Sequence, residues 1–132
     1  MPVSLDRLDH FVLTVADIDA TCAFYTRALG MKAETFGPLK RKALHFGRQK
    51  INLRPTSATQ KEWFTGRQVA AGSDDLCFLT SASPQAVADH LQACGVAIIE
   101  GPTDKRGAMG TIVSVYCRDP DGSLIEISSY KS

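Results

Sequence analysis

Two side chains near opposite ends of the chain have the chemistry to share one site. Glu126 lies in the apolar segment 123–128, whose alternation indicates a strand with apolar side chains on both faces. Burying an unpaired carboxylate is costly, so Glu126 needs a cation or a proton. His10 offers an imidazole, which binds divalent metals well. Alternatively, Glu126 faces water or pairs with an arginine, and His10 is an ordinary core or surface residue.

An internal repeat links these two side chains. The segments that begin near residues 8 and 74 run through the same pattern, and adding 65 maps His10 onto Asp75. The last strand of each half carries one polar residue between apolar ones, Asn52 in the first and Glu126 in the second. These four residues are therefore our candidate metal ligands. His10 and Glu126 are the stronger donors, since Asp75 could instead cap a turn and Asn52 is a weak neutral ligand.

The elements that must position these residues follow from periodicity and from turn and cap signals. Asp17 is suited to cap a first helix that stops at Gly30, and Ser83-Pro84 opens a second helix that stops at Gly95. A glycine-rich loop is expected over 103–110, and Asp119-Pro120-Asp121-Gly122 is a strong turn signal. The predicted strands are 7–14, 31–36, 41–46, 49–54, 75–80, 96–100, 111–117 and 123–129.

The predicted fold class is α+β, with two tandem βαβββ modules in a single domain spanning 1–132. Module one covers about 7–54, a polar connector covers 55–73, and module two covers about 74–130. Each module alone has one helix on a four-stranded sheet, which leaves the other sheet face open. Apposing the two sheets would enclose a shared cleft, and inward polar residues of both copies would converge there.

Three cations could orient a substrate. Arg54 follows Asn52 by two residues on the same strand face, so it could hold an anionic group, neutralise Glu126 and make a metal unnecessary, or be solvated. Lys105 and Arg106 lie in the expected loop, which is either a mobile lid that draws in an acidic ligand or a solvated turn. Cys77 is predicted to be core packing.

Composition limits the partners of the chain. The 132 residues carry a net charge of +1 with 44% hydrophobic residues, so we expect neither nucleic acid nor a membrane as partner. No secretion-type segment opens the sequence. The four cysteines are widely spaced, which favours reduced thiols over disulfides or a zinc site. The expected location is cytoplasmic.

The sequence resembles the vicinal oxygen chelate superfamily, which includes glyoxalase I, fosfomycin- and bleomycin-resistance proteins and extradiol dioxygenases. It looks most like the small single-domain glyoxalase-domain or virulence-type members. The stretches that carry the resemblance are 8–15, 24–31 and 118–126.

The resemblance implies a metal held from the first, fourth, fifth and eighth strands. His10 and Glu126 match the first-strand histidine and the last-strand glutamate of that set. Asp75 stands where metal-binding members often have histidine, and Asn52 where bacterial-type glyoxalase I has glutamate. These departures argue against extradiol dioxygenase and lactoylglutathione lyase activity.

Two functional hypotheses follow. In the first, a divalent ion (Mn²⁺, Ni²⁺, Fe²⁺, Co²⁺ or Zn²⁺) on His10 and Glu126, with or without Asp75, binds neighbouring oxygens of a small substrate for lyase, isomerase or transferase chemistry. Glu126 doubles as the proton acceptor if it leaves the metal during turnover. In the second, the chain is a metal-free protein of the bleomycin-resistance kind that sequesters a small molecule. The resemblance also implies a homodimer, formed either with or without exchange of modules between subunits.

Overall fold

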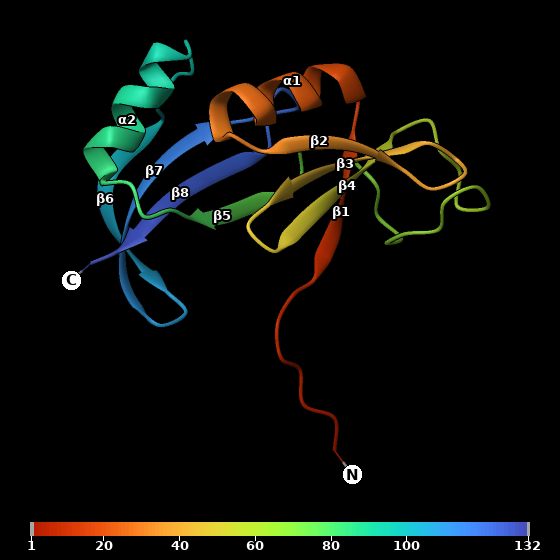
Figure 1. The fold of residues 1–132 in the computed structure, drawn as a ribbon, viewed down its shortest axis with the longest axis horizontal. Coiled ribbons are helices and arrows are strands. Elements are labelled where there is room, and N and C mark those ends of the chain that lie inside the picture. The colour runs from red at the N-terminus through yellow and green to blue at the C-terminus, as the bar shows by residue number, and fades with distance from the viewer. Residues whose placement is uncertain (1, 132) are drawn as a thin grey trace.

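The computed structural model describes residues 2–131 and consists of two βαβββ modules (Figure 1). The α+β class and the duplicated element order predicted from the sequence are confirmed. Module one contains β1 (His10–Val15), α1 (Ile18–Leu29), β2 (Lys32–Phe36), β3 (Arg41–Phe46) and β4 (Gln49–Pro55). Module two contains β5 (Asp75–Leu79), α2 (Pro84–Ala93), β6 (Glu100–Gly107), β7 (Gly110–Arg118) and β8 (Leu124–Tyr130).

Each module folds into one four-stranded mixed sheet. The strand orders are β1-β4-β3-β2 and β5-β8-β7-β6, so the first and last strands of each module are parallel neighbours. This topology brings Asn52 beside Val12 in module one and Glu126 beside Cys77 in module two. The candidate residues of one module therefore share one sheet, although they are far apart in the sequence.

Both helices begin and end as their capping residues predict. The Asp17 carboxylate accepts a hydrogen bond from the Ala20 amide at 3.0 Å, and the Ser83 hydroxyl accepts one from the Ala86 amide at 3.1 Å. Gly30 ends α1 in the left-handed conformation, with φ of 67°, which glycine adopts at no steric cost. Neither helix is long and apolar enough to span a membrane, within the residues that the structure describes.

The hydrophobic core lies on the helix side of both sheets. Strand alternation directs Leu13, Ile51 and Ile125 toward the helices, and these side chains join one continuous cluster that includes both modules. Phe46 of β3 and Phe78 of β5 meet edge to face at the seam between the modules, with ring centroids 5.2 Å apart. The opposite face of each sheet, here called its helix-free face, carries neither helix (Figure 1). The connector covers the part of the module-one face around Arg54.

The second half of module two differs from the sequence prediction. The predicted strand at 96–100 and loop at 103–110 are wrong, because β6 runs from Glu100 to Gly107 and pairs with β7. A shift in pairing register between Glu100 and Thr103 absorbs the Gly101-Pro102 pair, which the sequence analysis interpreted as a turn. The expected lid is therefore a β-hairpin whose tip alone, residues 108–109, is a turn.

Candidate functional site

The helix-free face of module two carries a row of polar side chains across all four strands. Cys77 of β5 pairs with Glu126 of β8, which pairs with Tyr116 of β7, which pairs with Glu100 of β6. The next row contains Ser128 and Ser114. Directly paired residues project from the same face, so these side chains surround Glu126.

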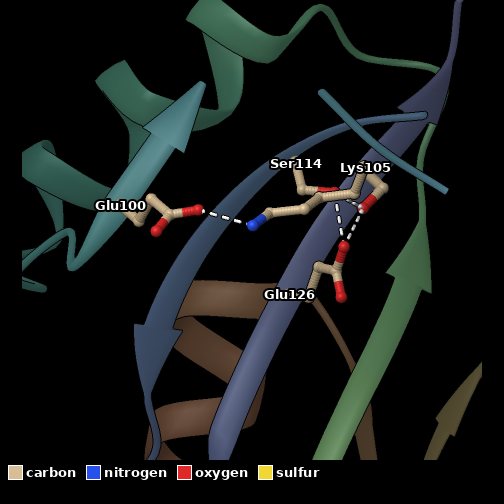
Figure 2. A network of polar contacts seen from close by, with 5 residues as sticks. Glu100, Lys105, Ser114 and Glu126 are labelled. Carbon is tan, nitrogen blue, oxygen red and sulfur yellow. Dashed lines mark hydrogen bonds and ion pairs between the residues drawn. The ribbon is translucent and has the colours of Figure 1, made fainter. Parts of the chain in front are cut away.

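Glu126 is held through one of its two oxygens. The Ser114 hydroxyl donates to Glu126 Oε2 at 2.5 Å, and the Ser128 hydroxyl lies 3.5 Å from the same oxygen (Figure 2). Ser114 and Ser128 are both buried, whereas Glu126 is half-buried. Within residues 2–131 no hydrogen bond or ion pair engages Glu126 Oε1. The side chain thus presents one constrained oxygen and one that is free to bind a ligand.

Lys105 shares this face with Glu126, and Arg106 does not. The Lys105 ammonium pairs with Glu100 at 2.9 Å and lies 5.4 Å from the centroid of the Tyr116 ring. Desolvation and the neighbouring Glu126 carboxylate raise the pKa of Tyr116 to about 12, so its phenol is a donor at neutral pH. Arg106 is the next residue along β6, so strand alternation directs it to the opposite face.

The helix-free face of module one carries His10 and Asn52. His10 Nδ1 lies 2.8 Å from the Asp9 carboxylate, and this hydrogen bond lowers the pKa of Asp9. Histidines that bind metals commonly place their second nitrogen against a carboxylate in this way. Asn52 is buried, and its Oδ1 has no hydrogen-bond partner within residues 2–131. A buried acceptor of this kind is costly unless a ligand or water satisfies it.

Arg54 is buried beneath the connector and does not pair with Glu126. Its Nε donates to the Trp63 carbonyl at 3.1 Å, and its Nη2 donates to the Ala58 carbonyl at 2.9 Å. Its Nη1 is buried without a partner among the described residues, and only 1% of the side chain is exposed. The predicted neutralisation of Glu126 by Arg54 is therefore not what the structure has.

The four predicted metal ligands are divided between the two sheets. His10 and Asn52 belong to module one, and Asp75 and Glu126 to module two, where Asp75 is exposed at the start of β5. Within residues 2–131 no three His, Cys, Asp or Glu side chains lie close enough to hold a metal. An imidazole, an amide and two carboxylates are suitable donors for a divalent cation. They fit the metal that the family implies only if a second copy brings a module-one face against a module-two face.

Sequence reasoning missed the hydroxyl groups around Glu126. Ser128 follows Glu126 by two residues, and Tyr116 and Ser114 alternate on the strand expected at 111–117, so alternation alone could have placed all three on its face. The interpretation of Cys77 as core packing is wrong, since its side chain is exposed on this same face. Its neighbours in β5, Leu76 and Phe78, project to the core instead.

Comparison with known proteins identifies the family. The model of the Glyoxalase/Bleomycin resistance protein/Dioxygenase superfamily matches residues 7–127, nearly the whole chain. The chain belongs to this superfamily. The resemblance inferred from the sequence motifs is thereby confirmed, and both modules belong to one glyoxalase-type fold.

Within the superfamily the chain is similar to named relatives. It is 48% identical over 126 residues to the virulence protein STM3117 of Salmonella typhimurium, spanning 96% of this chain and 85% of that protein. It is also 48% identical over 130 residues to the glyoxalase domain-containing protein RDO1 of Mycosarcoma maydis, covering 98% and 71% of the two chains. The integron cassette protein VCH_CASS1 of V. cholerae has the same fold, with a TM-score of 0.94, 46% identity and coverage of 99% and 100%.

Proposed function

We propose that this chain is a divalent-metal-dependent enzyme of glyoxalase type whose site is completed by a second copy. The observation that carries the proposal is the matching division of donors between two sheet faces that no helix covers. One face offers His10 and the unsatisfied Asn52 Oδ1, and the other offers Asp75 and the free Oε1 of Glu126. A homodimer that apposes the module-one face of one chain and the module-two face of the other would unite all four.

Charge complementarity supports this apposition. The helix-free face of module one has an excess of basic side chains, and that of module two has a slight excess of acidic ones. The basic side chains of module one are His10, Lys32, Arg41, His45 and Lys50, together with Arg54 beneath the connector, and the single acid is Glu34. The acidic side chains of module two are Asp75, Glu100 and Glu126, with the basic Lys105 and Arg118. Faces of opposite charge favour heterologous pairing of modules over pairing of like faces.

The residues have separate roles in the proposed reaction. When bound, a divalent cation supplies Lewis-acid stabilisation for an enolate or alkoxide that develops on the substrate. Glu126 would accept the substrate proton on Oε1 when that oxygen is not engaged by the cation, and Tyr116 donates a hydrogen bond from its protonated phenol. Lys105 binds an acidic substituent of the substrate at the edge of the proposed site. The substrate class that fits is a small molecule with two neighbouring oxygens.

Arg54 and Arg106 are less well placed than Lys105 to bind a substrate. Arg54 has one unsatisfied donor, Nη1, but its other donors hold the connector. Arg106 would reach the site only by turning around the edge of β6. We therefore retain Lys105 as the leading substrate ligand of the three.

Metal content of the purified protein tests the proposal. We expect a divalent metal in the wild type, and at least a tenfold (about 1.4 kcal/mol) loss of Mn²⁺ affinity in both His10→Ala and Glu126→Gln, because each change removes a ligand. Glu34→Gln is the control, since it removes a carboxylate from a helix-free face outside the ligand set. Metal retained by both ligand variants would contradict the proposal.

A metal-free binding protein is the second candidate. It is favoured by the neutral Asn52 and by the absence of a three-ligand cluster within residues 2–131. In that case the wild type contains no metal, and His10→Ala leaves ligand binding unchanged. The same measurements therefore distinguish the two functions.

We further propose a cytoplasmic location. All four cysteines are free, and Cys77 and Cys94 are engaged with polar neighbours in place of disulfide partners. Thiols are kept reduced in the cytosol, whereas oxidising compartments favour disulfides.

A further inference from the structure

Asn52 and Glu126 occupy equivalent positions in the two modules but have different cross-strand neighbours. Asn52 has Val12 and Ala43 as its cross-strand neighbours, and neither offers a hydrogen-bond donor from its side chain. Glu126 has Cys77 and Tyr116 at the matching places. The duplicated fold therefore does not by itself require polar groups beside this position. The donors in module two are a property of its sequence.

The hydroxyls beside Glu126 form a chain with one direction. Ser114 has a single hydroxyl proton, which it donates to Glu126 Oε2 at 2.5 Å. The contact of 2.6 Å between the Ser114 and Ser128 hydroxyls is then donated by Ser128, whose other acceptor, Glu126 Oε2, is much farther away at 3.5 Å. Since the Ser128 proton is used there, the Cys77 thiol, 3.4 Å from the Ser128 oxygen, donates to Ser128.

Every proton of this chain points toward Glu126. Ser114 and Ser128 are 0% and 1% exposed, so water does not compete for their hydroxyls. A fully satisfied chain of this kind fixes the orientation of its last acceptor.

We propose that Ser114 is a positioning residue, which anchors Glu126 Oε2 so that Oε1 faces the site with the carboxylate in a fixed orientation. This inference rests on the proposed function, because it names what orients the Glu126 ligand. Ser128 supports Ser114 by donating to its oxygen. Without Ser114, Glu126 would lose its shortest hydrogen bond and could rotate or bind through both oxygens.

Mn²⁺ titration of the full-length protein, followed by calorimetry, tests the inference without an activity assay. We expect Ser114→Ala to weaken Mn²⁺ binding at least tenfold, the usual effect of removing a hydrogen bond to a metal ligand. Ser114→Thr keeps the hydroxyl and should restore most of the affinity. Ser128→Ala should have a smaller effect than Ser114→Ala, because Ser114 can still donate to Glu126.

Ser129→Ala is the matched control. It removes a hydroxyl from the same strand, but Ser129 projects to the helix side and its hydroxyl makes no hydrogen bond within residues 2–131. We expect wild-type affinity for this variant. Circular dichroism and thermal unfolding of each variant show whether it is folded before titration.

The outcomes separate this inference from the proposed function. A wild type that binds Mn²⁺, together with a folded Ser114→Ala within twofold of it, overturns the positioning role and leaves the metal site intact. Equal losses in Ser114→Ala and Ser114→Thr also overturn it, since a general packing defect would explain both. A wild type that does not bind Mn²⁺ overturns the proposed function and this inference together.

Discussion

At the scale of single residues, one buried carboxylate joins the two modules. The Tyr25 hydroxyl on α1 donates to Asp119 Oδ2 at 2.8 Å, and Tyr25 is fully buried. Asp119 Oδ1 accepts from the amides of Ser123 and Asp121 at 2.9 and 3.0 Å, which shapes the β7–β8 turn. The turn of module two is thereby fastened to the helix of module one.

Tyr25→Phe should therefore lower the stability of the whole protein. The variant leaves a buried carboxylate oxygen without its donor, which costs about 1–3 kcal/mol. Urea unfolding measures this loss. Tyr130→Phe is the control, because the Tyr130 hydroxyl only accepts from the Met109 amide at an exposed turn and its loss should cost less than about 0.5 kcal/mol.

The difference in unfolding free energy between the wild type and Tyr25→Phe should depend on pH. Burial, with the Asp119 carboxylate adding to it, raises the pKa of Tyr25 far above its ordinary value of about 10. Above about pH 10 the unfolded chain releases this proton and the folded one does not, so wild-type stability falls there. Tyr25→Phe lacks this loss, and its deficit relative to wild type should narrow. A constant deficit would contradict the burial of an ionisable phenol at this site.

The residues of the candidate site could be predicted only in part. The repeat and the strand alternation correctly assigned Glu126 and Asn52 to equivalent strands. Arg54 was correctly placed on the face of Asn52, but its burial under the connector depends on carbonyls at Ala58 and Trp63. Every residue has a backbone carbonyl, so the pattern of residue types could not show which carbonyls Arg54 contacts.

At the scale of elements, prediction succeeded where local signals decide. The caps at Asp17 and Ser83 specify the helices, because each is a hydrogen bond formed within one turn. Prediction failed at β6, where the local glycine and proline signals favour a turn. Pairing with β7 outweighs them, and such long-range pairing cannot be seen in a window of a few residues.

The connector is an element whose fold depends on Arg54. Arg54 holds two of its carbonyls, and the Arg41 guanidinium stacks 3.9 Å from the centroid of the Trp63 ring. No carboxylate among residues 2–131 forms an ion pair with the buried Arg54, so its charge is stabilised by these carbonyl dipoles and, at longer range, by the Glu62 carboxylate. The connector and the sheet beneath it should therefore open together when the guanidinium is lost.

Arg54→Met tests this dependence, because methionine retains much of the apolar stem and removes the donors. We expect tryptic cleavage after Lys61 to become at least about tenfold faster, since the two lost hydrogen bonds each contribute on the order of 1.5 kcal/mol. Global stability should change less, because the variant also removes a buried charge. Arg48→Met, at the exposed β3–β4 turn, is the control. Equal cleavage rates would show that the connector is held by other contacts.

At the scale of the whole molecule, both helices lie on one side of the sheets, and the two helix-free faces lie on the other (Figure 1). A single chain therefore carries two half-sites and, under the proposed function, no complete one. In a symmetric dimer of this kind, each site would take His10 and Asn52 from one subunit and Asp75 and Glu126 from the other. This arrangement makes a quantitative prediction about mixed dimers.

His10→Ala and Glu126→Gln should complement each other when co-expressed with different affinity tags. In a mixed dimer one site receives both altered residues and the other receives neither, so about one Mn²⁺ should bind per dimer against about two in wild type. His10→Ala mixed with Asn52→Ala is the matched control, because both changes affect the same half-site and every site is damaged. Calorimetry of the doubly purified dimers gives the stoichiometry. If the sites were built within one chain, the first mixture would bind no better than the control, since each subunit would carry its own defect.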